Sequence, residues 1–476
     1  MPHETRPNIL FLFPDQHRGD WMPYPDDVLA KLGMPRLPLR MPVIEGLMAR
    51  GVTFFNCITP SPLCAPARSS LASGLRYEKT GVKGNGYNHP LELKTFYSVL
   101  KENGYTVGSC GKLDLRKPDH DFATTGWVPK HAALGFSEGY TIDNGGKHDA
   151  IRCGTTYVDP ASGKRKRYAD PTKVVPNCPY MRYLNDKGLM MVHVKDFAKR
   201  ARKYLGLPLD SSPTPLPDED YCDNWVTRNG LDIIKRFPAG RPWFLQVNFV
   251  CPHEPWDVTR RMRDAWKDVD FPGPNRSSKL AARAEKKVRQ NYAAMLENID
   301  RNAGLLIDAV ARRGELDNTI IVYSSDHGEM LGDFKKYGKS RPQRASIRVP
   351  LVIAGPGIAK GVTSGALVEL QDLAATFLDF AGLAMPEAVD SKSLRPVLEG
   401  KASQHRDHVV SALGAREGRV GNKKAGWRVV SDGRFKLVLH ADGLASLYDL
   451  DNDPWENVDI AASNTDMVEK LRKFLH

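Results

Sequence analysis

The sequence predicts an α/β fold in which helices cover both faces of a mostly parallel sheet, and three observations support this prediction. Short apolar runs of strand length recur along the chain and alternate with helical stretches. The first and fourth runs end in polar residues, as buried strands do at the carboxyl edge of open α/β sheets. One long amphipathic stretch supplies a helix that can cover such a sheet. The expected strands lie at residues 8–13, 105–109, 243–249, 319–324 and 350–353.

The amphipathic stretch at residues 289–312 predicts the clearest helix of the chain. Its apolar residues recur three and four positions apart, which is the period of a helix with one buried face. These residues are Tyr292, Met295, Leu296, Ile299, Ala303, Leu306 and Val310. We therefore expect this stripe to face the core and not a ligand.

The C-terminal part of the chain predicts a second, smaller domain. Two strand-like runs flank the turn at Asp432-Gly433, as in a β-hairpin, and a further strand and a terminal helix follow. The expected strands are residues 426–430, 434–439 and 447–450. The predicted division is a large α/β domain at 1–395, insertions within it at 115–240, and a small α+β subdomain with an antiparallel sheet and a helix at 396–476. The insertions are rich in Pro, Gly and charged residues, which is typical of lids and pocket walls.

Composition excludes several classes of protein. The chain has 476 residues, of which 41% are hydrophobic and 26% are charged, so it can bury a large core. Its seven cysteines are an odd number scattered along the chain, and we find neither an apolar leader nor a run that could span a bilayer. We therefore expect a cytoplasmic protein with no disulfide framework and no membrane partner.

The formal net charge of +12 agrees with an anionic partner. Basic residues cluster at 164–167 and 199–203, but no helix-turn-helix, zinc-finger or aromatic ribonucleoprotein motif accompanies them. Small anionic substrates, or a charged interface in a homo-oligomer, explain the basicity better than nucleic acid does. We expect no nucleic-acid partner, and the sequence leaves the assembly state open.

Cys64 lies in the most informative motif, Leu63-Cys64-Ala65-Pro66-Ala67-Arg68-Ser69-Ser70-Leu71-Ala72-Ser73-Gly74. Alone, it would be interpreted as a buried free cysteine. The proline two positions later, the arginine four positions later and the Ser-Leu continuation make the stretch resemble the signature of type I sulfatases. In that family a formylglycine-generating enzyme oxidises the cysteine to Cα-formylglycine (3-oxoalanine). The resemblance implies that Cys64 is the precursor of this group and that Arg68 holds the nucleophile and its oxyanion from one side.

A hydrated aldehyde suits ester hydrolysis because it has two hydroxyl groups. One hydroxyl attacks the sulfur or phosphorus centre, and the other then expels the product by elimination, without attack by water. For a sulfate ester the resemblance implies S–O cleavage through a covalent sulfo-enzyme hemiacetal.

Polar residues at two strand ends predict a metal site. Asp15 and Gln16 follow the first strand, and Asp326 and His327 follow the fourth. In sulfatases, which have the alkaline phosphatase-like fold, these segments hold one divalent cation, so the resemblance implies ligands at Asp15, Gln16, Cys64, Asp326 and His327. Many sulfatases have Asp in place of Gln16 and Asn in place of His327. Oxygen ligands favour Ca²⁺, the first choice, whereas an imidazole admits Mn²⁺, the second. Alternatively, the two aspartates only cap helices.

Three further segments resemble sulfatase segments and supply the remaining catalytic candidates. Lys112 matches a lysine that contacts the nucleophile and the sulfate oxygen in sulfatases. Lys339, in Gly338-Lys339, matches a second cation that contacts the transferred group. His253, between two prolines, matches the histidine at the scissile ester oxygen, and imidazole can donate a proton near neutral pH. Asp114 replaces the usual histidine. It is expected either to remove the proton that lets the intermediate collapse or to contact the substrate, unless it is a solvated loop residue.

Substrate contacts are less well defined by the sequence. Asn85, in Gly84-Asn85-Gly86, fits a turn, but certain phosphonate monoester hydrolases of this superfamily use an asparagine at a similar distance after the nucleophile. Other candidates within the insertions are His120, Asp143, His148, Tyr180 and Tyr183.

The motifs together predict a sulfuric ester hydrolase that acts on a small anionic sulfate ester. The alternative is a phosphonate monoester or phosphodiester hydrolase with the same site, which Gln16 and His327 favour and Lys112 does not. A third possibility is an unmodified protein that binds anions or glycans without turnover. The sequence does not identify the leaving alcohol.

Overall fold

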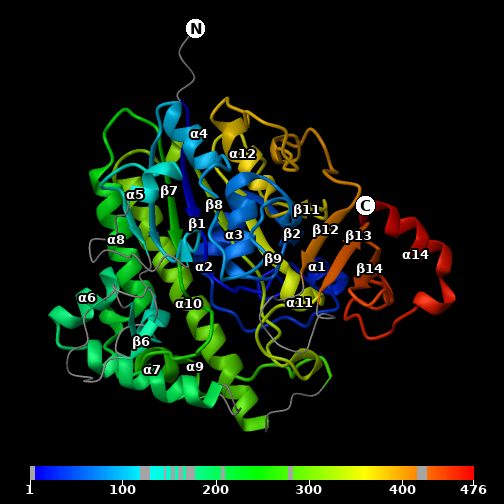
Figure 1. Ribbon diagram of the computed structural model, residues 1–476, viewed down its shortest axis with the longest axis horizontal. Coiled ribbons are helices and arrows are strands. Elements are labelled where there is room, and N and C mark those ends of the chain that lie inside the picture. Colours follow the sequence, from blue (N-terminus) through cyan, green and yellow to red (C-terminus); the bar gives the residue numbers. More distant parts are fainter. Residues whose placement is uncertain are drawn as a thin grey trace.

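A nine-stranded mixed sheet forms the centre of the protein in this computed structural model (Figure 1). The model describes residues 6–117, 129–143, 146–151, 156–158, 165–167, 176, 178–204, 210–276, 282–414 and 426–475. The strand order is β10-β2-β9-β8-β1-β7-β3-β4, with β11 beside β2. The strands are β1 (Asn8–Leu12), β2 (Gly51–Ile58), β3 (Thr106–Gly111), β4 (Thr141–Asp143), β7 (Trp243–Asn248), β8 (Thr319–Ser324), β9 (Arg348–Ala354), β10 (Val362–Ser364) and β11 (Val368–Glu369).

The prediction of a mostly parallel sheet is confirmed. Strand β9 runs antiparallel to both β8 and β2, and the other pairings in this sheet are parallel. Every strand predicted from the sequence is present, whereas β2, β4, β10 and β11 of this sheet were not predicted. Because β8, β1, β7 and β3 are adjacent and parallel, their carboxyl ends share one edge of the sheet, and β2 ends at the same edge.

Helices cover both faces of this sheet, as predicted. The side chains of β1 alternate between two cores: Leu10 and Leu12 enter one, whereas Ile9 and Phe11 enter the other. The first core includes α1 (Asp26–Lys31), α2 (Pro42–Arg50), α8 (Cys222–Arg236), α9 (Arg260–Trp266) and α10 (Ala282–Arg312). The second includes α3 (Cys64–Ser73), α4 (Phe96–Glu102), α12 (Asp372–Phe380) and α13 (Arg395–Leu398).

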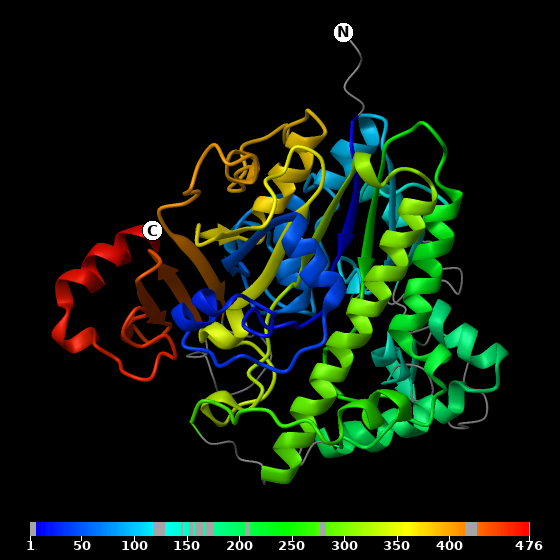
Figure 2. The same ribbon diagram turned by 180° about the vertical axis from the view of Figure 1, so that it is seen from behind.

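Helix α10 confirms the clearest helix prediction. It begins at Ala282, earlier than expected, and ends at Arg312 as expected. All residues of the predicted apolar stripe are buried in the first core. Figure 2 shows this long helix crossing one face of the sheet.

The predicted insertions contain more helix than their composition indicates. Their described elements include α5 (Pro129–Ala133), η3 (Lys147–Ile151), β5 (Thr156–Val158), β6 (Arg165–Arg167), α6 (Pro179–Asp186) and α7 (Met190–Tyr204). In α6 the Tyr180 hydroxyl donates to the Asp220 carbonyl at 2.8 Å, and the Tyr183 hydroxyl bonds to the Asp220 carboxylate. These two tyrosines therefore contact another part of the insertions and not the predicted catalytic residues.

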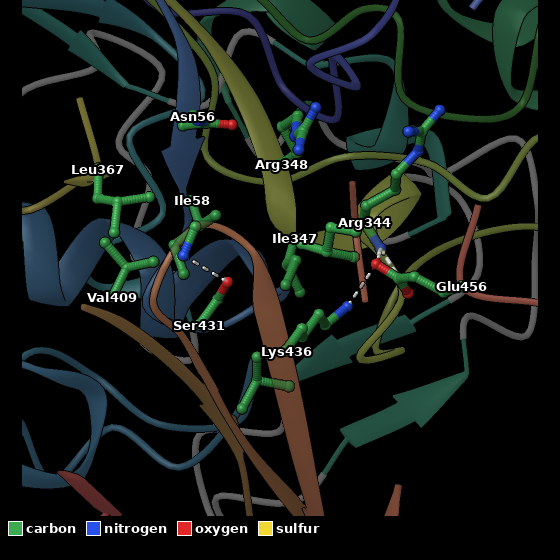
Figure 3. A pocket seen from close by; sticks show the side chains of 13 residues that line it. Asn56, Ile58, Arg344, Ile347, Arg348, Leu367, Val409, Ser431, Lys436 and Glu456 are labelled. Atoms are coloured by element: carbon green, nitrogen blue, oxygen red, sulfur yellow. Dashed lines mark hydrogen bonds and ion pairs between the residues drawn. The ribbon is translucent and has the colours of Figure 1, made fainter. Parts of the chain in front are cut away.

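A four-stranded antiparallel sheet forms the C-terminal part, as predicted. Its strands are β12 (Val409–Leu413), β13 (Trp427–Ser431), β14 (Phe435–His440) and β15 (Ala445–Asp449), and α14 (Thr465–Arg472) packs on it. A cavity between this sheet and the large one is lined by apolar residues, such as Ile58 and Val409, and by charged ones (Figure 3). Among the charged residues, Lys436 pairs with Glu456 at 2.7 Å, and the Glu456 carboxylate also accepts from the backbone amide of Arg344 in α11 (Arg344–Ile347). The boundary at residue 395 stays a prediction.

Among the described residues, no helix combines the length and the apolar character that crossing a bilayer requires.

Candidate active site

The predicted metal ligands meet at the carboxyl edge of the large sheet. Strands β1 and β8 are parallel neighbours, with Leu12 opposite Tyr323, so the residues that follow them lie side by side. One ligand atom each from Asp15, Cys64, Asp326 and His327 lies within 4.8 Å of the others, and all four side chains are fully buried. The structure thus brings together two segments more than 300 residues apart, as the sequence predicted.

Cys64 occupies the first position of α3, which follows β2. Its Sγ lies 3.3 Å from His327 Nε2 and 3.5 Å from both Lys112 Nζ and Lys339 Nζ. Burial and Asp15 raise the pKa of the Cys64 thiol, but the neighbouring lysines outweigh them and lower it to about 7. The environment therefore stabilises negative charge at this position.

His327 is oriented as a metal-binding imidazole would be. Its Nδ1–H donates to the Gly328 carbonyl at 3.1 Å, which leaves the Nε2 lone pair facing Cys64. Two carboxylates, one imidazole and residue 64 thus form a donor set that fits one divalent ion.

Arg68 lies behind the two ligand carboxylates. Its Nε donates to Asp326 Oδ2 at 3.0 Å and its Nη2 to Asp15 Oδ2 at 3.2 Å. Its Nη1 bonds to the Lys112 carbonyl and to Asn248 Oδ1. The guanidinium is buried and faces these protein acceptors, so it offsets the charge of the two carboxylates. The contact of Arg68 with the nucleophile and its oxyanion stays a prediction.

Two lysines flank Cys64, in agreement with the sequence prediction. Lys112 follows β3 and bonds to Asp15 Oδ2 at 2.6 Å, while Lys339 Nζ bonds to Gln16 Oε1 at 2.6 Å. Burial would lower the pKa of both ammonium groups, but neighbouring anionic groups raise it, so both stay charged. Together with Arg68 they surround the site with positive charge, which suits an anionic substrate.

His253 follows β7 and reaches the same site. Its Nδ1–H donates to the Glu254 carbonyl at 2.7 Å, and its Nε2 accepts from Lys339 at 2.5 Å. His148 Nε2–H donates to the same carbonyl at 2.7 Å, and the two imidazole rings lie 4.4 Å apart. Burial and Lys339 lower the pKa of His253 well below its usual value. Of the substrate-contact candidates within the described part of the insertions, His148, from η3, lies beside His253.

Asp114 and Asn85 lie next to the site but bond to protein groups. Asp114 is buried, bonds to Lys117 at 2.6 Å and lies 3.7 Å from Lys112. Burial raises its pKa, but these two lysines outweigh that effect and lower it far below the usual value, so Asp114 is a weak base. Asn85 Oδ1 accepts from the Ala65 amide at 3.1 Å and so caps the helix that begins with Cys64.

The structure adds residues that the sequence analysis missed. Asn248, the last residue of β7, bonds to Arg68 at 2.9 Å and to Ser109 at 3.0 Å. Glu254 and Glu329 both bond to the Gln16 side chain. A polar residue at a buried strand end was the available signal for Asn248, and the motif Asp326-His327-Gly328-Glu329 was the signal for Glu329. Among the other candidates, His120 and the Asp143 side chain lie outside the described residues.

Comparisons with known proteins agree with this geometry. The family model Sulfatase matches residues 7–383, and the model "N-sulphoglucosamine sulphohydrolase, C-terminal" matches residues 332–476. An arylsulfatase of Clostridium perfringens is 26% identical over 99% of this chain and 94% of its own length, and arylsulfatase K of Bos taurus is 27% identical over 99% and 82%. The phosphonate monoester hydrolase of Agrobacterium radiobacter shares the fold, with a TM-score of 0.76 at 20% identity over 99% of this chain and 95% of that one. The chain belongs to the sulfatase family, within the alkaline phosphatase-like superfamily.

Proposed function

We propose that the protein hydrolyses a sulfate ester with a formylglycine nucleophile derived from Cys64 and one divalent metal ion. The observation that supports this most directly is the position of Cys64. Its Sγ lies between two lysine ammonium groups and beside the His327 imidazole, at the start of a helix. When formed, the formylglycine hydrate supplies one hydroxyl for attack on sulfur and a second for release of sulfate.

The residues of this chain divide the remaining work. Lys112 and Lys339 face the position of the nucleophile, so they would bind the sulfate oxygens and stabilise the charge that develops on them. His253 holds its Nδ1–H on the Glu254 carbonyl and accepts from the Lys339 ammonium at Nε2, so Nε2 would take a proton from Lys339 and pass it to the leaving alcohol. Asp114 is too weak a base to remove the proton in the release step, and we assign it to holding Lys112 and Lys117.

The metal would be held by Asp15, Gln16, Asp326, His327 and the modified residue 64. Carboxylate and amide oxygens favour Ca²⁺, and the imidazole admits Mn²⁺ as the second choice. A bound cation would polarise a sulfate oxygen and so add to the charge stabilisation that the lysines provide.

Mass spectrometry of the peptide that contains Cys64 tests the nucleophile. The protein should be produced with a formylglycine-generating enzyme and, separately, without one. We expect the first sample to show the lower mass of the aldehyde and to turn over an aryl sulfate, and the second to keep the thiol and be inactive. An active sample with an unconverted thiol would refute the mechanism.

A phosphonate monoester or phosphodiester hydrolase is the second candidate. Asn85 favours it because its Oδ1 accepts from the Ala65 amide, next to Cys64. Gln16 and His327 also favour it, since Gln16 bonds to Lys339 and His327 lies beside Cys64. Rates on an aryl sulfate, an aryl phosphonate monoester and a phosphodiester, measured on one converted sample, separate the two functions. Faster turnover of either phosphorus ester than of the aryl sulfate would make the phosphonate or phosphodiester hydrolase the first candidate.

A further inference from the structure

The Gln16 side chain has charged partners at both ends. Its Nε2 donates to Glu254 Oε2 at 2.5 Å and also to Glu329 Oε2, while its Oε1 accepts from Lys339 Nζ at 2.6 Å. An amide nitrogen only donates and an amide oxygen only accepts. A flipped amide would set its oxygen against two carboxylates and its N–H groups against an ammonium. The three neighbours therefore admit one orientation.

Glu329 is itself held rigidly. Its Oε1 accepts from the backbone amides of Leu331 at 3.0 Å and Gly338 at 2.6 Å, which leaves Oε2 for Gln16. Gly338 precedes Lys339, so one turn fixes the carboxylate on one side of the amide and the ammonium on the other. Glu254 belongs to the segment that positions His253, and its Oε2 lies 3.2 Å from His253 Nδ1.

We propose that Glu254 and Glu329 are positioning residues that aim the Gln16 carbonyl oxygen at the metal site, and that this acidic pair requires an amide at position 16. The inference rests on the metal of the proposed function. A carboxylate at position 16, which many sulfatases have, would face both glutamates without the N–H groups that Gln16 donates to them. The departure at Gln16 is thus explained by Glu254 and Glu329.

The proposal can be tested by exchanging the amide at position 16 with the carboxylate at position 329. The variants are Gln16→Glu, Glu329→Gln and the double variant that combines them. In the double variant the amide introduced at position 329 can accept the Leu331 and Gly338 amides with its oxygen and donate to the new carboxylate with its nitrogen. The number of buried charges is then the same as in the natural protein, so the double variant should recover what each single variant loses.

A matched control exists elsewhere in the molecule. Gln371 Nε2 donates to Glu369 Oε2 at 2.5 Å and both side chains are buried. The pair lies at the end of β11 and the start of α12, and it is not among the residues that converge on Cys64. Glu369→Gln reports the effect of losing a buried carboxylate next to a glutamine amide without altering the metal site. We expect it to lower the melting temperature and to leave metal affinity unchanged.

The readout is the affinity for Ca²⁺ and for Mn²⁺, measured by calorimetry on metal-free protein, with the melting temperature as a check on folding. We expect each single variant to bind about 10- to 100-fold more weakly and the double variant to recover at least about tenfold. Should Glu329→Gln not fold, Glu254→Gln serves the same test because Glu254 lies nearer the surface.

Unchanged affinity in the single variants, or a double variant as weak as the sum of both losses, would overturn the proposal. A natural protein that binds no divalent ion would overturn both this proposal and the metal of the proposed function. If the natural protein binds the ion but turns over no sulfate ester, the proposed function fails while the positioning role is still tested by the affinities.

Discussion

Two clusters of charged side chains in this protein differ in how completely their carboxylate oxygens are bound by cations. The junction cluster, which joins β11 and α12 to the C-terminal part, consists of Arg76, Glu369, Asp372 and Arg406. Its arginines bind both oxygens of their partners: Arg76 contacts both oxygens of Glu369 at 3.1 and 2.8 Å, and Arg406 contacts both oxygens of Asp372. Each carboxylate in this cluster is thus closed by its own arginine.

The active-site cluster, consisting of Asp15, Asp326, Arg68, Lys112 and Lys339, is open by comparison. Asp15 Oδ2 accepts from Lys112 and Arg68, while its Oδ1 lies 3.9 Å from both Cys64 Sγ and His327 Nε2. Arg68 contacts one oxygen of each carboxylate, and the other oxygen of Asp326 accepts from the backbone amides of Gln16 and His327. The open oxygen is therefore Asp15 Oδ1. The comparison teaches that buried cations alone do not identify a functional site, because both clusters contain them. The active-site cluster differs in that ligand atoms from several residues converge on one centre.

The largest expected effect is the difference in turnover between variants of two buried cysteines, Cys64 and Cys57. We expect Cys64→Ala to lower turnover of an aryl sulfate by at least about 10⁴-fold, because the group that forms the covalent bond is lost. Initial rates measure the effect. Cys57→Ala is the matched control, since Cys57 is also buried but lies in β2 in the second core, and it should keep the turnover of the folded protein. Comparable losses in both variants would contradict the assignment.

Two buried lysines provide the next comparison. Lys112→Met removes a cation that faces the substrate and should lower kcat by about 10²- to 10³-fold. Lys436→Met removes the partner of Glu456 at the C-terminal sheet, so it should destabilise the fold by about 3–5 kcal/mol and leave kcat of the folded fraction intact. Rates and urea unfolding of both variants measure these effects. A fall in kcat for Lys436→Met as large as that for Lys112→Met would break the distinction.

Titration of the unconverted, metal-free protein distinguishes the same two thiols by pH. The pKa of Cys64 is lowered to about 7 against the usual 9, whereas burial raises that of Cys57. The thiolate absorbance that belongs to Cys64 is the part that is absent from the Cys64→Ala variant. This absorbance should increase with pH with a midpoint near pH 7, which corresponds to an acidity constant about a hundredfold larger than that of an ordinary thiol. Because the folded pKa is the lower one, the associated stability is present above pH 9 and disappears as the pH falls through 7. A midpoint at or above pH 9 would contradict the conclusion that the lysines of the active-site cluster lower the pKa of Cys64.

The sequence predicted those parts of the site that follow from parallel strands. Asp15, Lys112, His253 and Asp326 each follow a strand, and adjacent parallel strands bring such residues to one edge. Contacts between distant segments were not predictable in this way. Gln16 and Glu329 are 313 residues apart, and nothing near either of them indicates the pairing.

Local sequence also failed where tertiary packing decides the role of a residue. The helical spacing of Arg68 placed it near Cys64 correctly, but only the fold shows that its guanidinium faces Asp15 and Asp326. Strand β2 was missed, although it is apolar and buried, because a short apolar run does not distinguish a strand from a helix segment. Tyr180 and Tyr183 were chosen from composition alone, and their hydroxyls bind elsewhere.

The smallest expected effect concerns the leaving group and tests the open side of the cluster. His253→Ala removes the imidazole that accepts from Lys339 and lies 4.0 Å from Asp15, so it should slow poor leaving groups most. We expect kcat/KM for an alkyl sulfate to fall about tenfold further than for an aryl sulfate that leaves without protonation. His148→Phe keeps an aromatic ring against His253 but removes the second hydrogen bond to the Glu254 carbonyl, so it should change both substrates equally. Equal losses for both esters in His253→Ala would remove its assignment as the proton donor and leave the lysines as the groups that determine the rate.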